Sequence, residues 1–430
     1  MKRYFHHSQR ISNIFIVLIT LCIGVLIFLS ITKLFTTSLV KTPSCKRCNI
    51  VLVVLDPLRA DALSCYGYTK NTAPNLCAFA KKNLLLTNMY SHASWTLPSI
   101  MSLFSSQYPS EHDVFTPSVD VLEADAITLP MALKDAGYHT VFIGPTDSDH
   151  VPLDKGIGRG FDKIIPYTSI YDASLTIDAL QKSQTDNPTF VFIHSFDLRA
   201  NSTNTNRSPD TFVLDPDYTY GSVDPWLLTV PLHTPDSPAT ITYLRKWYDQ
   251  IIVEIDQQLA ILLTNIQSGA WGKNTIIAIT SDHGTEFGEH GRSDHGVNLY
   301  ATTTHVPFIL SVPNTAPQTI NSLTQSIDIY PSLLKAAGIP APRSTKGIDI
   351  FSKYNSFSIS QLEPEKHLVG IRTMEWSYYF DPAYASQGSI YNLRNDPAET
   401  RPLSLSDNAK TISELMHAYQ KILPNDARKE

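Results

Sequence analysis

Runs of apolar, β-branched residues recur along the chain and alternate with segments whose apolar residues follow a helical period. Continuous apolar runs of this length are typical of strands buried on both faces. The runs lie at 49–56, 140–144, 189–195, 275–281 and 306–312, and the helical patterns at 73–83, 127–137, 239–267 and 326–338. Alternating strands and helices indicate a sheet covered by helices on both sides. We therefore predict an α/β fold, a three-layer sandwich with one large, mostly parallel sheet.

The start of the chain has a different pattern. Residues 11–32 contain no charged side chain and consist mainly of Ile, Leu and Val. An apolar run of about 20 residues matches the hydrocarbon thickness of a bilayer, whereas a cleaved signal peptide has an apolar region of only about 7–15 residues. We therefore predict one uncleaved N-terminal transmembrane helix within the segment 1–47. Basic residues flank the run on both sides, so they do not decide its orientation.

The pattern changes twice more along the rest of the chain. Residues 200–238 are rich in Asn, Thr, Ser, Asp and Pro and have no regular period, which is typical of a long surface loop. Beyond residue 346, short strand-like segments precede a helical pattern near 408–422. We therefore predict a main α/β domain over 48–345, interrupted by the loop, and a small antiparallel α+β subdomain over 346–430.

Composition narrows the range of partners. Apolar residues make up 43% of the chain and charged residues 17%, which is typical of a globular protein and excludes a disordered one. The net charge of -6 is modest, so we predict no nucleic-acid partner. Among the five cysteines, the CKRC motif at 45–48 has no second CxxC after it. A local feature is therefore favoured over a zinc site, and a Cys65–Cys77 disulfide stays open.

Ligand-type side chains follow two of the predicted strands. Asp56 comes directly after the first strand, and Asp282 and His283 follow the strand that begins at Thr275. Ligand sites of parallel sheets gather beyond the carboxyl ends of the strands, and two carboxylates with an imidazole suit a divalent cation. Either aspartate alone fits a turn or a helix cap equally well. Together they predict one divalent metal site, for which calcium, magnesium, manganese and zinc all stay open.

The stretch SWTLPSI at 94–100 raises a further candidate, Thr96. Pro98 and the apolar spacing after it predict the start of a helix, so Thr96 lies at or near the N-cap. The N-terminus of a helix favours a bound anion such as phosphate or sulfate. A hydroxyl held there beside a cation has a lowered pKa and is a candidate nucleophile. The alternative is a threonine that only caps the helix, the commoner reason for this local pattern.

These motifs together resemble the sulfatase family of the alkaline phosphatase superfamily, and the resemblance runs from about residue 48 to 400. The matching stretches include NIVLVVLDPLRADALSCYGY, SWTLPSIMSLFSSQYPSEHDV, TLPMALKDAGYHTVFIG, WYDQIIVEIDQQLAILL, NTIIAITSDHGTEFGEHG, SIDIYPSLLKAAGIP and SIYNLRNDPAET. The resemblance implies that Asp56, Thr96, Asp282 and His283 hold the metal and that Thr96 is also the nucleophile. It further implies cleavage of sulfate or phosphate esters by in-line attack.

The nucleophile position departs from that of sulfatases proper. In those enzymes a Cys or Ser, followed by x-P-x-R, is oxidised to formylglycine, whereas this chain has Thr96 and Ile100 at the two positions. Threonine does not give that aldehyde, so we predict an enzyme that is not formylglycine-dependent. Threonine is the nucleophile of the similar membrane-anchored phosphoethanolamine transferases and lipoteichoic acid synthases. The predicted N-terminal anchor fits that comparison, although those relatives usually carry several membrane spans and one is predicted here.

Four further positions lie around the substrate site. Pro57 replaces a second carboxylate ligand that many relatives have, and Arg199 stands where the family has a histidine. An arginine grips an oxyanion bidentately, so Arg199 is a candidate substrate-binding residue. His295 matches a substrate-side histidine and is a candidate anion binder or general acid for the leaving group. His194 ends a strand near the site, and both a substrate contact and a core position stay open for it.

The resulting hypothesis is a membrane-anchored, metal-dependent hydrolase or phosphotransferase that acts on sulfate or phosphate esters through Thr96. The resemblance places its catalytic domain outside the cytoplasm, and the substrate is an anionic ester of a glycan, a lipid headgroup or a small molecule. The alternative is a catalytically degenerate relative that binds an anionic glycan or lipid headgroup, which the changes at positions 57, 100 and 199 favour. Retention of all four core positions favours the enzyme.

Overall fold

A computed structural model describes most of the chain beyond the N-terminal segment. The described residues are 43–146, 150–166, 173–199, 238–269, 271–272, 274–362 and 367–424, and all belong to the compact unit Thr42–Glu430. The predicted anchor at 11–32 and nearly all of the predicted loop at 200–238 lie outside them. Within the described ranges, no helix combines the length and apolarity that a bilayer crossing needs.

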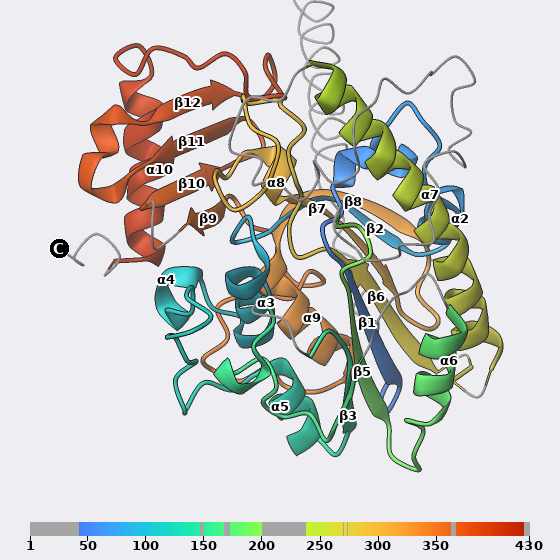
Figure 1. Ribbon diagram of the computed structural model, residues 1–430. Helices are drawn as coiled ribbons and strands as arrows, with labels where there is room; N and C mark the ends of the chain where they lie inside the picture. The colour runs from blue at the N-terminus through green and yellow to red at the C-terminus, as the bar shows by residue number, and fades with distance from the viewer. Residues whose placement is uncertain are drawn as a thin grey trace, which may run out of the picture. The chain divides into compact units, whose positions relative to one another are not determined.

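Eight strands form the main sheet, in the order β4-β3-β5-β1-β6-β7-β2-β8 (Figure 1). The strands are β1 (Asn49–Leu55), β2 (Leu84–Tyr90), β3 (His139–Gly144), β4 (Lys163–Pro166), β5 (Thr189–Ser195), β6 (Thr275–Thr280), β7 (His305–Ser311) and β8 (Gln318–Gln325). Of these eight, β7 runs antiparallel to both of its neighbours, and the other pairings are parallel. The prediction of a large, mostly parallel sheet is confirmed.

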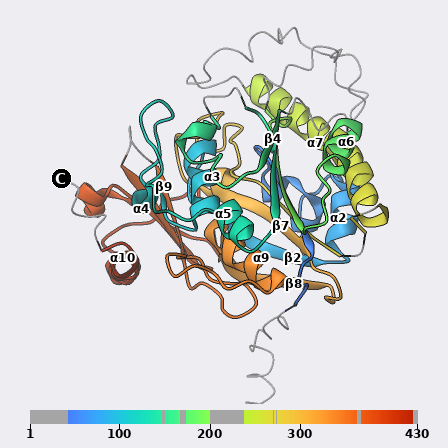
Figure 2. The ribbon, with the colours of Figure 1, turned by 90° about the horizontal axis from the view of Figure 1, so that it is seen from below.

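Helices cover both faces of this sheet (Figure 2). One face carries α2 (Pro74–Ala80), α6 (Ala173–Gln181) and α7 (Pro238–Ser268), and the other α3 (Thr96–Ser105), α5 (Leu129–Asp135) and α9 (Ile329–Ala337). The side chains of β1 show why, because all its residues except Asn49 are buried. Val51, Val53 and Leu55 pack into the core that contains the apolar face of α7, and the alternate residues of the strand point to the opposite layer.

The remaining elements are short or belong to the C-terminal part. They are α4 (Pro109–His112), α8 (Ala301–Thr304), α10 (Ala409–Ile422) and the 3₁₀ helices Ala60–Ala62, Ser64–Tyr66, Leu153–Lys155, Ser326–Asp328 and Pro382–Gln387. A second sheet has the order β12-β11-β10-β9, with β9 (Ser358–Leu362), β10 (Leu368–Arg372), β11 (Trp376–Phe380) and β12 (Ser389–Asn392). All its pairings are antiparallel. Tyr419 of α10 packs on Phe380, so the predicted small antiparallel sheet with a closing helix is confirmed.

The edge strand of this second sheet holds the segment that leads into α3. The Gln361 backbone N–H donates to His92 O at 2.8 Å, and Ser360 Oγ donates to Ser91 O at 2.6 Å. His92 Nδ1 lies 2.6 Å from Ile359 O. Buried backbone groups of the two segments therefore satisfy each other, and the C-terminal sheet supports the start of α3.

Two disulfides lie near the start of the described chain. Cys65 and Cys77 are bonded, with 5.4 Å between their Cα atoms, and join the loop after β1 to α2. Cys45 and Cys48 are also bonded to each other. The CKRC motif is therefore a local cross-link, and the Cys65–Cys77 pairing that stayed open is present.

Two buried aspartates on α7 hold the segments that pack against this helix. Asp256 accepts the backbone N–H of Asn75 at 3.0 Å and of Leu76 at 2.7 Å, so it caps α2, whose own N-cap, Ala73, has no capping side chain. Asp249 accepts Tyr68 Oη–H at 2.7 Å and pairs with Lys70 Nζ at 2.8 Å. These contacts confirm a structural role for both aspartates.

The capping by Asp256 gives a test of the interface between α2 and α7. Asp256→Ala removes the acceptor for two helical N–H groups, and we expect a loss of about 1–2 kcal/mol in the free energy of unfolding. The measurement is urea denaturation. Asp178→Ala is the matched control, because Asp178 forms an exposed pair with Lys182 on α6, and such pairs contribute less than about 0.5 kcal/mol. Equal losses in the two variants would contradict the capping role.

Candidate active site

Three adjacent strands bring the predicted metal ligands to one edge of the main sheet. The sheet order places β1 between β5 and β6, and the register sets Val54 beside both His194 and Thr280. Asp56 and Asp282 therefore leave the sheet side by side, as expected for the carboxyl ends of parallel strands.

A serine hydroxyl fixes the two strand ends to each other. Ser281 Oγ accepts the backbone N–H of Leu58 at 2.8 Å and donates to Leu55 O at 2.6 Å. Ser281 immediately precedes Asp282, and Leu55 immediately precedes Asp56. The hydroxyl thus takes the place of backbone hydrogen bonds between β1 and β6 where the two strands end.

The two carboxylates and two imidazoles form a buried cluster. His194 Nε2 lies 3.7 Å from Asp56 Oδ2 and 3.9 Å from Asp282 Oδ2. His283 Nε2 lies 3.5 Å from Asp56 Oδ1 and 3.5 Å from Asp282 Oδ2. One ligand atom from each of Asp56, His194 and Asp282 falls within 4.8 Å of the others, so three strand ends contribute to a single point.

The polar atoms of this cluster fit a divalent cation. Asp56 Oδ1, Asp282 Oδ2 and both ring nitrogens of His194 are buried and have no hydrogen-bond partner among the described residues. A buried polar atom without a partner is costly, and native proteins seldom leave several together. A cation between the carboxylates and the imidazoles would satisfy Asp56 Oδ1, Asp282 Oδ2 and His194 Nε2, the ring nitrogen that faces both carboxylates. The residues present therefore fit the metal that the sequence predicts.

The charges of the cluster also favour a cation. Burial, and then the charge of Asp56, raise the pKa of Asp282 well above its usual value. Burial works in the same direction on Asp56, but Arg199, helped by His283 and His194, holds the pKa of this carboxyl well below its usual range. Burial lowers the pKa of His194 to about 3 and also lowers that of His283. The imidazoles are therefore neutral at neutral pH, the form that binds metals.

Thr96 is the first residue of α3 and contacts this cluster directly. The N-cap of the helix is Trp95, and no side chain caps it. Instead, Thr96 Oγ donates to Asp56 Oδ2 at 3.1 Å, accepts an N–H of Arg199, and lies 3.3 Å from His283 Nε2. The alternative of a threonine that only caps its helix is therefore wrong, because the hydroxyl bonds to the cluster and not to the helix backbone.

Arg199 reaches the cluster from the turn that follows β5. Its Nη2 donates to Asp56 Oδ2 at 2.7 Å and to Thr96 Oγ. The guanidinium lies over the ring of Phe196, with its Cζ 4.0 Å from the ring centre, and the side chain is 15% exposed. Arg199 therefore supplies positive charge beside Thr96, whereas Ile100 on α3 is a fully buried apolar residue.

His295 lies against the other side of the cluster. Its ring packs on that of His283, with 4.5 Å between the ring centres, and burial lowers its pKa to about 3. Gly296 donates its N–H to Ser94 O at 2.8 Å, which joins this loop to the segment before Thr96. All seven predicted site residues thus lie in or beside one cluster, with His194 in contact with the carboxylates.

Sequence reasoning assigned His194 to the substrate or the core and omitted it from the metal ligands. A signal was available, because His194 ends a strand of the same apolar type as the one that precedes Asp56. The adjacency of β5 and β1, however, is a property of the sheet order that the sequence pattern does not specify.

The other histidines make structural contacts. His112 Nδ1 accepts the Val114 N–H, and its Nε2 bonds to Ser102 Oγ at 3.0 Å. His305 Nε2 bonds to Thr87 O at 2.8 Å, and His290 bonds to Glu286 and stacks on Tyr300. These contacts give all three histidines a structural role.

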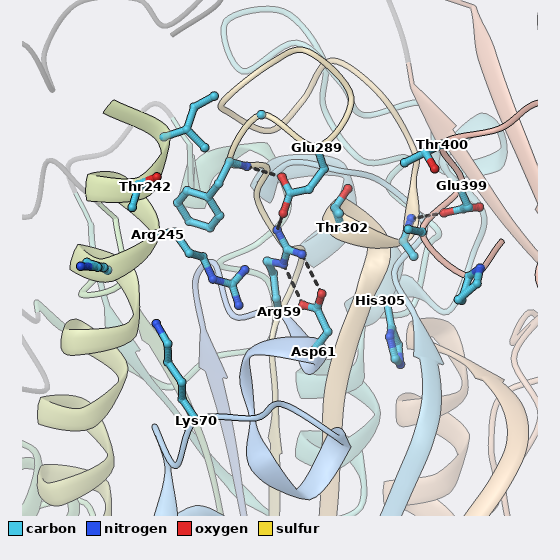
Figure 3. A pocket seen from close by; sticks show the side chains of 17 residues that line it. Arg59, Asp61, Lys70, Thr242, Arg245, Glu289, Thr302, His305, Glu399 and Thr400 are labelled. Carbon is cyan, nitrogen blue, oxygen red and sulfur yellow. Dashed lines mark hydrogen bonds and ion pairs between the residues drawn. The ribbon is translucent and has the colours of Figure 1, made fainter. Parts of the chain in front are cut away.

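A separate pocket of about 800 Å³ lies behind the cluster, between α7, α8 and residues 397–400 (Figure 3). Arg59 is held there between Asp61 and Glu289, and Arg245 lies over the rings of Tyr68, Tyr248 and Phe287. A Cβ on Gly284, next to His283, would lie 2.2 Å from Thr302 O, so the wall between pocket and cluster is tightly packed.

Comparison with known proteins agrees with the geometry. The family model described as Sulfatase matches residues 48–339. The chain belongs to the sulfatase family. This sulfatase-family chain is 22% identical over 482 residues to N-acetylglucosamine-6-O-sulfatase of Bacteroides thetaiotaomicron, a match that covers 87% of this chain and 86% of that protein.

Two solved structures share the fold of this sulfatase-family protein. One is the protein BT4656 in complex with its substrate D-glucosamine-2-N,6-O-disulfate. Its TM-score is 0.71 at 19% identity, and the match covers 90% of this chain and 100% of the other. The second is phosphonate monoester hydrolase of Agrobacterium radiobacter, with a TM-score of 0.66, 18% identity and coverage of 88% and 96%. The shared fold therefore occurs with both sulfur- and phosphorus-centred esters.

Buried neutral histidines give this sulfatase-family protein a predictable acid sensitivity. Burial lowers the pKa of His112 from 6.5 to about 3, so between these values the unfolded chain binds more protons than the folded one. The free energy of unfolding then falls as the pH drops through this window. We expect His112→Asn, measured by urea denaturation at several pH values, to lose part of this dependence. Substitution of the exposed His417 should leave the dependence unchanged, and an unaltered slope in His112→Asn would contradict the account.

Metal binding by the cluster can be measured without a substrate. We expect a divalent cation to raise the melting temperature of the protein by mass action, and His194→Ala to weaken the affinity for the cation by at least about 100-fold. Isothermal titration calorimetry measures the affinity. His139→Gln is the control, because His139 pairs with Asp162 outside the cluster. Equal affinity in His194→Ala and the wild type would remove His194 from the ligand set.

Proposed function

We propose that this protein cleaves an anionic sulfate or phosphate ester through Thr96, with a divalent cation bound by the strand-end cluster. The observation that carries the proposal is the environment of the Thr96 hydroxyl. It lies at the N-terminus of α3 and contacts a carboxylate, an imidazole and a guanidinium. The guanidinium and the N-terminus of α3 stabilise negative charge both on the hydroxyl and on an oxyanion bound beside it.

Asp56, Asp282, His194, His283 and Thr96 are the proposed ligands of the cation. When bound there, the cation polarises the ester and lowers the pKa of the Thr96 hydroxyl. Of the four candidate metals, zinc is the one that imidazole donors suit best, because calcium, magnesium and manganese favour oxygen ligands. The inclusion of His194 therefore shifts the preference towards zinc.

The chain's own residues account for the proposed covalent step. Thr96 Oγ forms a bond to the sulfur or phosphorus atom while the bond to the alcohol oxygen breaks on the opposite side. The hydroxyl proton is released to solvent as the pKa of Thr96 is lowered, and the departing alcohol oxygen takes up a proton from solvent, so the step is balanced. His295 is neutral and lies beside His283, and we assign it the contact with the leaving group. Attack of water on the Thr96 ester gives hydrolysis, and attack of a second alcohol gives transfer.

Threonine at the nucleophile position supports an enzyme without formylglycine. Phosphorus accepts a second in-line attack on a threonine ester readily, and a phosphonate monoester hydrolase is among the structures with this fold. Sulfated glycans stay candidates because the similar N-acetylglucosamine-6-O-sulfatase acts on a sulfate ester. We propose that the apolar run at 11–32 anchors the enzyme in a membrane with the active site outside the cytoplasm, near glycans and lipid headgroups.

Substitution of Thr96 tests the proposal. We expect Thr96→Ala to reduce kcat on aryl sulfates, phosphate mono- and diesters or phosphonate esters by at least about 10³-fold. Thr96→Ser is the matched variant, because it keeps a hydroxyl in the same place and should retain measurable turnover. Mass spectrometry of quenched reactions should find the phosphoryl or sulfuryl group on Thr96 of the wild type.

Two results would overturn the proposal. Unchanged turnover in Thr96→Ala would show that Thr96 is not the nucleophile. Absence of turnover on every ester class would favour the alternative of a protein that binds its ligand without cleaving it. In that alternative the protein is a degenerate relative. Isothermal titration calorimetry would then detect binding of sulfated glycans or anionic headgroups without their cleavage.

A further inference from the structure

One nitrogen of Arg199 is hydrogen-bonded to two oxygens of residues that are also proposed ligands of the cation. Nη2 donates to Asp56 Oδ2 at 2.7 Å and to Thr96 Oγ. Both oxygens belong to the proposed ligands of the cation, and both are nearly or completely inaccessible to solvent. Asp56 Oδ1 has no partner among the described residues, so the guanidinium competes with a cation that binds through Thr96 Oγ or through both oxygens of Asp56.

The competition is electrostatic as well as steric. A guanidinium at this place and a divalent cation between Asp56 and Asp282 would be like charges within a few ångströms, in surroundings without water to screen them. The carboxylate of Asp56 is the group that Arg199 neutralises. Either the guanidinium or the divalent cation, but not both at once, can neutralise the Asp56 carboxylate in this way.

The contacts of Arg199 are compatible with a second position of its side chain. Its guanidinium carbon lies over the ring of Phe196, 4.0 Å from the ring centre, a contact that a cation can keep while its hydrogen bonds change. Its Nε is buried and has no hydrogen-bond partner among the described residues. A tetrahedral oxyanion beside Thr96 would satisfy Nε and an Nη together, in the bidentate geometry that arginine prefers.

We propose that Arg199 is an exchangeable internal counter-ion, which leaves Asp56 and Thr96 when a divalent cation binds and then grips the oxyanion of the ester. The proposal rests on the proposed function and adds an order of events to it. Without the cation, Arg199 covers the nucleophile and does not contribute to anion binding. With the cation, the same side chain becomes an anion ligand, so the two ligands bind cooperatively.

The test measures anion affinity in four states. Inorganic sulfate and phosphate are titrated by calorimetry into wild type and Arg199→Gln, each with and without saturating Mn²⁺. We expect Arg199→Gln to lose at least about tenfold in anion affinity with Mn²⁺, as for a charged hydrogen bond, and less than about twofold without it. A loss of the same size in both states, or no loss in either, would overturn the exchange.

Metal affinity gives a second, independent reading. Removal of the competing guanidinium should let Arg199→Gln bind Mn²⁺ at least about fivefold more tightly than the wild type. Arg199→Lys keeps the charge and should bind Mn²⁺ less tightly than Arg199→Gln. Arg245→Gln is the matched control, because that arginine is stacked on aromatic rings and paired with Asp249, and its affinities should equal those of the wild type. Unchanged or weaker Mn²⁺ binding in Arg199→Gln would contradict the proposal.

The two proposals fail in different ways. Turnover that survives Thr96→Ala would overturn the proposed role of Thr96 but would not affect the four anion affinities measured for wild type and Arg199→Gln. If those affinities show no cooperativity between Mn²⁺ and the anion, the exchange is overturned while Thr96-dependent turnover still stands. Absence of Mn²⁺ binding, checked also with Ca²⁺, Mg²⁺ and Zn²⁺, overturns the exchange, and covalent labelling of Thr96 would then decide the nucleophile separately.

Discussion

Two carboxylates that have lost their water must be balanced by positive charge, and much of this structure follows from that requirement. Asp56 and Asp282 lie at neighbouring strand ends with at most 2% of either residue exposed. Their mutual repulsion in a buried setting would be destabilising without a cation, an arginine or aligned backbone dipoles. The structure directs Arg199 and the N-terminus of α3 at this point, and the neutral imidazoles supply lone pairs for the cation that we propose.

Support for this arrangement comes from outside the three strands as well. Ser281 ties the two strand ends together, and the edge of the C-terminal sheet holds the segment before Thr96 through Ser360 and Gln361. A nucleophile has to be held to within about half an ångström of its productive geometry. The second sheet thus contributes to the site without placing a predicted site residue in it.

The sequence pattern predicted the parts of the fold whose signal is local. The apolar runs that became β1, β5, β6 and β7 are long and uninterrupted, and Asp56, Asp282 and His283 were found because they directly follow two of them. The short, exposed β4 and the half-polar β8 lack such a run and were not predicted. The strand β2 was missed as well, although it begins with three leucines. The reversed direction of β7 has no local signal either, since strands of both directions share the same composition.

The site was predicted less completely than the fold because its contacts are long-range. Arg199 and Thr96 are 103 positions apart, and no periodicity links a residue in a turn to a hydroxyl on a distant helix. Family resemblance suggested both residues, but only the coordinates show that they bond to each other and that Arg199 shares Asp56 with the cluster. The direct approach of His194 to both carboxylates likewise depends on the order of strands in the sheet.

The burial of α3 has a consequence for how this protein can change its specificity. All ten residues of the helix that begins at Thr96 are buried, and close-packed interiors tolerate few changes of volume. Few substitutions are therefore tolerated around the proposed nucleophile Thr96, whereas Arg199 and His295 lie on connecting segments between the helices and strands. New ester preferences would arise by substitution in those segments, so the natural place to begin directed evolution of this enzyme is its loops rather than its helix.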